Sequence, residues 1–148
     1  MILNPRLAAE LGVYNWQLVA QVREIERWRA VVAAVVTRLG GDAEAVELAR
    51  LGVSELLCNV VKHVQHDPRC ELKITREGET IRVSVDDNSR HEPKIGMPDW
   101  SSESGRGLWL LGEMVQDWGF SPRGGGKSVW FRFPLTAVSA RPTNGRSR

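Results

Sequence analysis

Four polar side chains with complementary chemistry lie on one face of a predicted helix. At about 100° per residue, they fall within about a quarter-turn of one another: Glu55, Asn59, Lys62 and His63. The opposite side of the same helix is aliphatic: Val53, Leu57, Val60, Val61 and Val64. An acid, an amide, an amine and an imidazole together can abstract a proton, ligate a hard cation and contact an anion. An amphipathic helix with a solvated polar face accounts for the same pattern equally well.

A pair of glycines opens a further predicted helix. Gly105 and Gly107 flank Arg106, and Leu108 starts an apolar run at helical spacing. Glycines at a helix start leave backbone N–H groups accessible at the positive end of the helix, where phosphate binds well. The motif is compatible with a phosphate site, although an ordinary helix-entry turn is the more frequent reason for such glycines.

A carboxylate follows directly after a predicted buried strand. Asp87 is placed there to accept a hydrogen bond from an exocyclic amine such as that of adenine. A buried acceptor of this kind discriminates well against a ligand that lacks the amine. The competing interpretation is a turn residue, since Asp87, Asn88 and Ser89 form a polar cluster typical of turns.

Periodicity predicts two helices before the first hairpin. Apolar residues at helical spacing indicate a helix over 22–39, which ends at Gly40 and Gly41. Asp42 caps a second helix, which begins at residue 43, carries the four polar side chains and ends near residue 64. Asp67 and Pro68 then stop helical continuation.

Alternating residues predict the strands. Strands are expected over 13–19, 70–75 and 80–86, the last two joined by a hairpin around Glu77 and Gly78. A last hairpin has its turn at 122–126 and its second strand at 127–133, with Phe131 and Phe133 on one face and Trp130 on the other. Two helices feeding antiparallel strands indicate a mixed α/β sandwich.

Two segments lack such periodicity. Residues 90–103 are polar and contain two prolines, which is typical of a mobile loop. Residues 134–148 are rich in Ser, Thr, Pro and Arg, so we expect a single domain over 1–133 and a disordered basic tail.

Composition excludes several classes of protein. The chain has 148 residues, 42% of them hydrophobic, which fits one domain with a sizeable core. The tail carries three arginines without an acid, so the formal charge of +2 falls to −1 for the rest, which argues against nucleic-acid binding. No apolar run is long enough for a membrane span, and the start lacks the features of a signal peptide, so we expect a cytoplasmic protein. Cys58 and Cys70 have no metal-ligand spacing and are expected to be reduced packing residues.

The ordered motifs together resemble a known superfamily. Glu55, Asn59 and His63, then Asp87 and Ser89, then the Gly105–Leu108 stretch, then residues 126–131 are similar to the four boxes of the Bergerat-fold ATPases. Within them, the short chain resembles the anti-sigma factor serine kinases of the RsbW type, from about residue 13 to 133. The resemblance implies a two-layer α/β sandwich with a mixed, mostly antiparallel sheet and helices on one face.

The resemblance also implies a role for each residue. Glu55 would orient or deprotonate an attacking serine hydroxyl, Asn59 would ligate Mg²⁺ between the phosphates of ATP, and Asp87 would hold the adenine amine. The residues implied in wrapping the phosphates are Gly105, Arg106, Gly107 and Leu108. The remaining implied nucleotide contacts are Lys62, His63, Ser89, Lys127 and Ser128. Phosphoryl transfer depends mostly on positioning and charge neutralisation, which such a set can supply.

Two departures from the family pattern bear on activity. Ser89 stands where the superfamily often has glycine, which places a bulkier residue beside the base. The candidate lid over 90–103 is short for the superfamily, and a short lid sequesters phosphates less completely. Both departures favour weak or absent hydrolysis.

The leading functional hypothesis is an ATP-dependent serine kinase that also acts as an anti-sigma factor. The family implies that it sequesters a sigma factor, phosphorylates an antagonist with a STAS domain, and forms a homodimer. The alternative is a partner-switching module that works by contact alone, with or without ATP. A histidine kinase fragment fits less well because this length leaves no room for a second helical domain, and a gyrase or mismatch-repair type ATPase lacks its transducer region.

Overall fold

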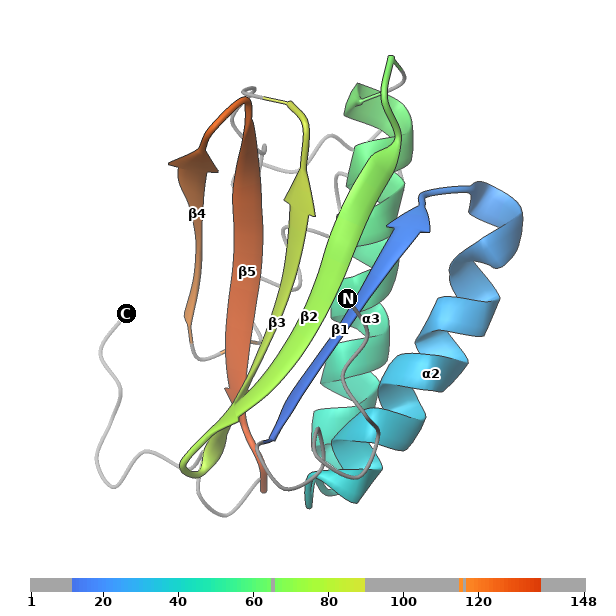
Figure 1. Ribbon diagram of the computed structural model, residues 1–148. Helices are drawn as coiled ribbons and strands as arrows, with labels where there is room; N and C mark the ends of the chain where they lie inside the picture. Colours follow the sequence, from blue (N-terminus) through green and yellow to red (C-terminus); the bar gives the residue numbers. More distant parts are fainter. Residues whose placement is uncertain (1–11, 65, 90–114, 116, 137–148) are drawn as a thin grey trace, which may run out of the picture.

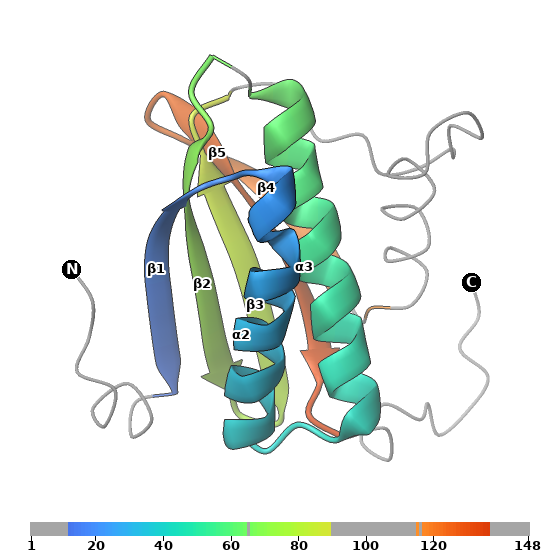
Figure 2. The ribbon, with the colours of Figure 1, turned by 90° about the vertical axis from the view of Figure 1, so that its right-hand side faces the viewer.

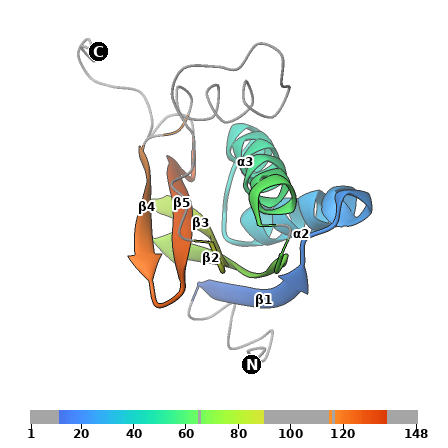
Figure 3. The same cartoon turned by 90° about the horizontal axis from the view of Figure 1, so that it is seen from above.

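In the part of the chain that the structure describes, two helices cover one face of a five-stranded sheet. The computed structural model describes residues 12–64, 66–89, 115 and 117–136. Its elements are β1 (Val13–Val19), the 3₁₀ turn η1 (Val22–Glu24), α2 (Ile25–Arg38), α3 (Ala43–His63), β2 (Arg69–Glu77), β3 (Thr80–Asp87), β4 (Asp117–Arg123) and β5 (Gly126–Pro134). The strand order is β1-β2-β3-β5-β4, and every pair of neighbours is antiparallel (Figure 1). Seen from above, α2 and α3 lie on the same side of the sheet (Figure 3), which confirms the two-layer α/β sandwich.

Strand alternation divides the sheet into an apolar and a polar face. The residues that point toward the helices are fully or almost fully buried: Leu72, Ile74, Ile81, Val83, Val85, Val129, Phe131 and Phe133. Together with buried residues of α2 and α3 they form one continuous core. Figure 2 shows the two helices side by side in front of the sheet, so the opposite face of the sheet is not covered by either helix.

The long helix α3 begins at a side-chain cap and packs at a glycine. The Asp42 carboxylate accepts a hydrogen bond from the Ala45 N–H at 2.9 Å, as the sequence predicts for an N-cap. Gly52 lies in the middle of α3, where glycine costs about 1 kcal/mol relative to alanine. A Cβ at this position would lie 1.9 Å from Cζ of Phe131, so the glycine lets α3 approach the sheet closely.

The first strand, β1, ties the sheet to α2. It pairs with β2 over its whole length, from Val13 opposite Thr75 to Val19 opposite Arg69. Trp16 packs edge to face against Trp28 of α2, with ring centroids 6.1 Å apart. The strand predicted over 13–19 is therefore confirmed.

The last hairpin is tighter than its sequence predicts. The turn expected over 122–126 is wrong at both ends, because β4 continues to Arg123 and β5 begins at Gly126. Pro122 lies within β4, opposite Lys127. Since β4 is an edge strand, a residue without an N–H is tolerated there. The turn itself needs only Gly124, with a φ of 50°, and Gly125.

The folded part extends past the boundary expected at Phe133. Pro134 still belongs to β5, and Leu135 is only 2% exposed. The backbone of Leu135 donates to the carbonyl of Glu79 at 2.9 Å and accepts from the N–H of Asp42 at 2.8 Å. Composition misses this anchor because a single leucine after a proline carries no periodic signal. The rest of the expected tail, 137–148, lies outside the described residues.

Length alone would permit one helix to reach across a bilayer. Helix α3 has 21 residues, but charged side chains such as Glu47, Arg50 and Lys62 interrupt its apolar surface. Within the described ranges, no helix combines the length and apolarity that a membrane span requires.

Candidate functional site

The four polar side chains on α3 differ in their exposure to solvent. Glu55 is half-buried, Asn59 is 9% exposed, and Lys62 and His63 at the end of the helix are exposed. Glu55 and Asn59 are four positions apart, so they lie one above the other on the same face. Asn59 is predicted on the polar face of this helix, and its low exposure places the amide where that face meets the core.

Charged side chains of α3 shift the pKa of the Cys58 thiol. Burial raises the pKa of the Cys58 thiol, the nearby Glu55 carboxylate raises it further, and Lys62 lowers it. The acid and the amine predicted from the sequence therefore lie close enough to the same thiol to act on it. The thiol is held in its neutral form, which suits a packing residue.

Asp87 points toward the helix layer at the end of β3. Side chains alternate along a strand, so Asp87 shares the inner face with Val83 and Val85, whereas Asp86 points to the open face. Asp87 is buried, as expected for a carboxylate that follows a buried strand. Its Oδ1 accepts a hydrogen bond from the Ser89 N–H at 2.9 Å, which brings these two predicted site residues together.

Lys127 neutralises the Asp87 carboxylate. The two residues lie directly opposite each other on β3 and β5. Lys127 Nζ lies 3.1 Å from Asp87 Oδ1 and 2.9 Å from Oδ2, and the two side chains are only 4% and 3% exposed. The sequence places Lys127 among the nucleotide contacts, but the role as the counter-ion of Asp87 was missed. The sequence alone does not give the register between two strands that lie far apart in the chain, so it does not show that Asp87 and Lys127 face each other.

Gly126 makes this pairing possible. A Cβ on Gly126 would lie 1.8 Å from the backbone oxygen of Asp87, so only glycine permits β5 to begin so close to the end of β3. The glycine before Lys127 is therefore a signal for close backbone approach that the sequence does contain. Ser128, the next predicted contact, points to the open face, because it alternates with the inward-facing Lys127 and Val129.

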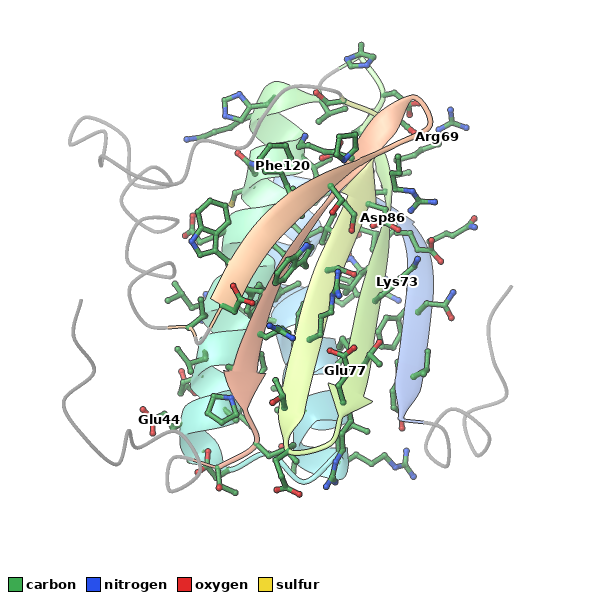
Figure 4. All side chains as sticks on the ribbon, turned by 90° about the vertical axis from the view of Figure 1, so that its left-hand side faces the viewer. Glu44, Arg69, Lys73, Glu77, Asp86 and Phe120 are labelled. Atoms are coloured by element: carbon green, nitrogen blue, oxygen red, sulfur yellow. The ribbon has the colours of Figure 1, made fainter. Side chains whose placement is uncertain are left out.

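A second acidic centre lies on the open face of the sheet. Asp86 is contacted by Lys73 from β2, with Nζ 3.1 Å from Oδ2, and by Arg123 from β4. Figure 4 shows Lys73 and Asp86 on this face, with Arg69 toward the same end of the sheet. A cavity of about 890 Å³ at this end of the sheet is lined by both Asp86 and Asp87 and reaches Arg69, Arg123 and the glycine turn. Sequence reasoning missed this cluster, although two adjacent acids in a strand must point to opposite faces.

Cys70 lies close to both acids. Burial raises the pKa of its thiol to about 12, and the negative charges of Asp87 and Asp86 add to the effect. Cys58 and Cys70 are both free thiols, and Cys70 is buried, as expected for a packing residue. Among the residues that the structure describes, no cluster of three His, Cys, Asp or Glu side chains could hold a metal ion by itself.

The predicted phosphate segment is not part of this description. Gly105, Arg106, Gly107 and Leu108, like the loop over 90–103, lie outside the described residues. At the base end of the expected nucleotide, Asp87 and Lys127 offer a buried acceptor and a buried donor, which fits a polar heterocycle. At the helix, Asn59 offers an amide oxygen, a ligand type that Mg²⁺ accepts.

Comparison with known proteins identifies the family of this chain. A family model described as the histidine kinase-like ATPase domain matches residues 18–133. The chain therefore belongs to the histidine kinase-like ATPase domain family, and membership implies that it binds ATP. No curated protein matches the sequence significantly.

One solved structure shows the same fold, and a second is reported beside it. The RsbU and RsbW domains of Rv1364c from Mycobacterium tuberculosis align with a TM-score of 0.64 and 19% identity, over 83% of this chain and 32% of that one. The histidine kinase domain of a blue-light activated kinase from Erythrobacter litoralis gives a TM-score of 0.48 and 22% identity, over 75% and 61% of the two chains. The present chain thus spans about a third of the first of these proteins, and the likeness to it concerns the fold.

Proposed function

We propose that this domain is an ATP-dependent serine protein kinase that also acts as an anti-sigma factor. The observation that carries the proposal is the placement of Asp87, a buried carboxylate at the end of β3 on the helix side of the sheet. The resemblance of the motifs implies that Asp87 is the acceptor for the adenine amine, and a buried carboxylate at a strand end suits that role. The fold likeness to a structure that includes an RsbW domain supports the choice within the family.

The proposed reaction uses few protein groups. Glu55 takes the proton from a serine hydroxyl of the substrate protein while the serine oxygen forms a bond to the γ-phosphorus. The bond from that phosphorus to the bridging oxygen breaks, and ADP leaves. Bound Mg²⁺ supplies charge neutralisation at the phosphates, and Asn59 would hold it. Lys62 and His63 lie exposed at the end of the same helix, where they can contact phosphate or line the entrance.

The remaining assignments concern the rest of the nucleotide. Asp87, Ser89 and Lys127 form the base end of the site. The phosphates are assigned to Gly105, Arg106, Gly107 and Leu108, which open a predicted helix. Ser128 faces away from this layer, so we now assign it no contact with the nucleotide.

The proposed partners are a sigma factor and an antagonist protein with a STAS domain. Phosphorylation adds about two negative charges to the antagonist, which is sufficient to end one complex and free the kinase for another. The kinase would act as a homodimer in the cytoplasm. These partners rest on the resemblance of the motifs to the RsbW type.

A second candidate is a partner-switching module without kinase activity. The buried ion pair between Lys127 and Asp87 favours it, because a carboxylate already bound to an ammonium is a weaker acceptor for a nucleobase amine. Such a module would hold a sigma factor and release it when an antagonist competes for the same face.

Phosphate transfer separates the two candidates. Purified protein is incubated with labelled ATP, Mg²⁺ and candidate antagonists from the same genome, and modified serines are mapped by mass spectrometry. The kinase hypothesis predicts one modified serine on one antagonist. Binding of ATP without transfer to any antagonist that binds the protein would contradict it and favour the second candidate.

A further inference from the structure

We infer that β1 is a self-association surface, at which a second copy of this chain adds its own β1 antiparallel and extends the sheet. Among the strands that the structure describes, β1 lies at one edge of the sheet and β4 at the other (Figure 1). An edge strand presents unpaired N–H and C=O groups to which another strand can pair. The inference rests on the homodimer of the proposed function, to which it assigns a surface, and it does not depend on nucleotide binding.

The two edges of the sheet differ in their protection against such pairing. β4 contains Pro122 and begins and ends with a charged residue, Asp117 and Arg123. Proline and charge on an edge strand both discourage the addition of a further strand. β1 reads Val-Tyr-Asn-Trp-Gln-Leu-Val, without a charged residue or a proline, and pairs with β2 residue by residue along its whole length. The β1 edge therefore lacks the features that keep a strand edge unpaired, and Val19 at its end is 43% exposed.

The hydrogen bonds to β2 determine which backbone groups of β1 point outward. The Ala20 N–H donates to the Pro68 carbonyl at 2.9 Å, and the Gly12 carbonyl accepts from the Arg76 N–H at 2.8 Å. In an antiparallel ladder every second residue bonds to a given neighbour, so the even-numbered residues over 12–20 bond to β2. The residues whose N–H and C=O groups point away from β2 are therefore the odd-numbered ones: Val13, Asn15, Gln17 and Val19.

One antiparallel register of two β1 strands uses all of these outward groups. Two copies related by a two-fold axis contact each other with the same surface. With the axis at Trp16, Val13 pairs with Val19 of the second copy, and Asn15 pairs with Gln17 of the second copy. A shift of two residues in either direction leaves Val13 or Val19 of both copies unpaired. The backbone therefore favours the register that is centred on Trp16.

The side chains of β1 match in the same register. On the open face, valine meets valine and asparagine meets glutamine. On the helix side, Tyr14 meets Leu18, and Trp16, which is only partly buried, meets its own copy. Each apolar or aromatic side chain thus faces another, each amide faces an amide, and no like charges lie opposite each other, which is what stabilises cross-strand pairs. Because β1 reads nearly the same in both directions by side-chain type, a second copy fits it better than an unrelated strand.

Sedimentation velocity of the full chain at concentrations up to about 100 µM tests the surface. The wild type should form a dimer. Gln17→Pro removes an outward N–H and leaves the ladder to β2 intact, so it should weaken dimerisation at least about tenfold, because the same bond is lost in both copies. Gln17→Ala keeps the N–H and is the matched control, which should dimerise like the wild type. Thermal unfolding checks that each variant folds, and Asn15→Pro replaces Gln17→Pro if the latter does not.

Disulfide formation tests the register. Directly opposed residues in the proposed pairing have Cα atoms about 5.5 Å apart, which a disulfide can bridge. Diagonal neighbours are about 7–8 Å apart, beyond the usual disulfide range. A mixture of Asn15→Cys and Gln17→Cys proteins should therefore form a mixed disulfide under mild oxidation, mapped by mass spectrometry of the joined peptides. Either protein alone, in which the two new thiols lie diagonally, should form much less.

Four results would overturn the inference. They are a wild type that stays monomeric, a dimer equally stable in the wild type and the folded proline variant, equal weakening by Gln17→Ala and Gln17→Pro, and as much disulfide in either cysteine variant alone as in the mixture. A monomeric wild type would also remove the homodimer from the proposed function. ATP binding and phosphate transfer are measured separately, so failure of the β1 surface is distinguishable from failure of the nucleotide site.

Discussion

At the level of single residues, the neighbouring acids Asp86 and Asp87 point to opposite faces of the sheet and form separate ion pairs. Alternation sends Asp87 to the helix layer and Asp86 to the open face, and each meets a lysine from an adjacent strand. The inner pair is almost completely buried, whereas Lys73 in the outer pair is 40% exposed. Removing one charge of the inner pair therefore leaves the other charge buried, where water cannot take the place of the lost partner.

Substitution of Asp87 affects stability as well as binding. Asp87→Asn leaves the buried Lys127 ammonium without a counter-ion, which should cost about 3–5 kcal/mol of unfolding free energy. The double variant Asp87→Asn/Lys127→Gln should recover most of that loss and still bind ATP weakly. Urea unfolding and calorimetry measure the two quantities. A single variant as stable as the wild type would contradict the buried pair.

Cys70 predicts a pH dependence of stability. The pKa of its thiol rises from 9.0 to about 12 on folding, so folding favours the protonated thiol. This contribution is fully present below about pH 9 and is lost as the pH rises toward about 12. Wild-type protein should therefore lose more unfolding free energy between about pH 8 and pH 11 than Cys70→Ala does. Parallel pH profiles for the two proteins would show that the thiol makes no such contribution.

At the level of elements, local signals predict the secondary structure but not the contacts between strands. The Asp42 cap and the apolar period predict α3 correctly, and alternation predicts β1, β2, β3 and β5. The extension of β4 to Arg123 is missed, because a proline normally argues against a strand, and only the edge position makes it acceptable. The Asp87–Lys127 contact is missed because it joins strands 40 residues apart in the sequence.

Gly52 of α3 packs directly against the ring of Phe131 in β5. Gly52→Ala gains about 1 kcal/mol in helix propensity, but the new methyl group would overlap the ring of Phe131. Overpacking of this kind costs about 1–3 kcal/mol, so we expect a net loss of unfolding free energy. In the background of Phe131→Leu, the same substitution should be neutral or stabilising. Equal effects in both backgrounds, measured by chemical denaturation, would mean that the helix and the ring do not meet.

At the level of the whole molecule, the chain is an ATPase-family domain whose last described residues close the fold. Leu135 joins the start of α3 to the β2–β3 hairpin through its two backbone hydrogen bonds. The fold and the family follow from patterns within the sequence. The partners of the domain do not, because docking surfaces carry no comparable local signal.

Truncation tests the end of the domain. A chain that stops after Phe133 loses the buried Leu135 side chain, worth about 1.5–3 kcal/mol, and two backbone hydrogen bonds. A chain that stops after Thr136 keeps both, so it should match the full-length protein in thermal stability. Equal stability of the two truncated chains would contradict the anchoring role of Leu135.

The most direct test of the kinase hypothesis is the rate of phosphate transfer by Glu55→Ala. Single-turnover transfer from ATP to the antagonist is compared among the wild type, Glu55→Ala and Glu47→Ala, in which an exposed acid of the same helix is removed. We predict that transfer slows by at least about a hundredfold in Glu55→Ala alone, while ATP affinity and sigma-factor capture remain as in the wild type. Transfer at the wild-type rate by Glu55→Ala would contradict the assignment of Glu55 as the base.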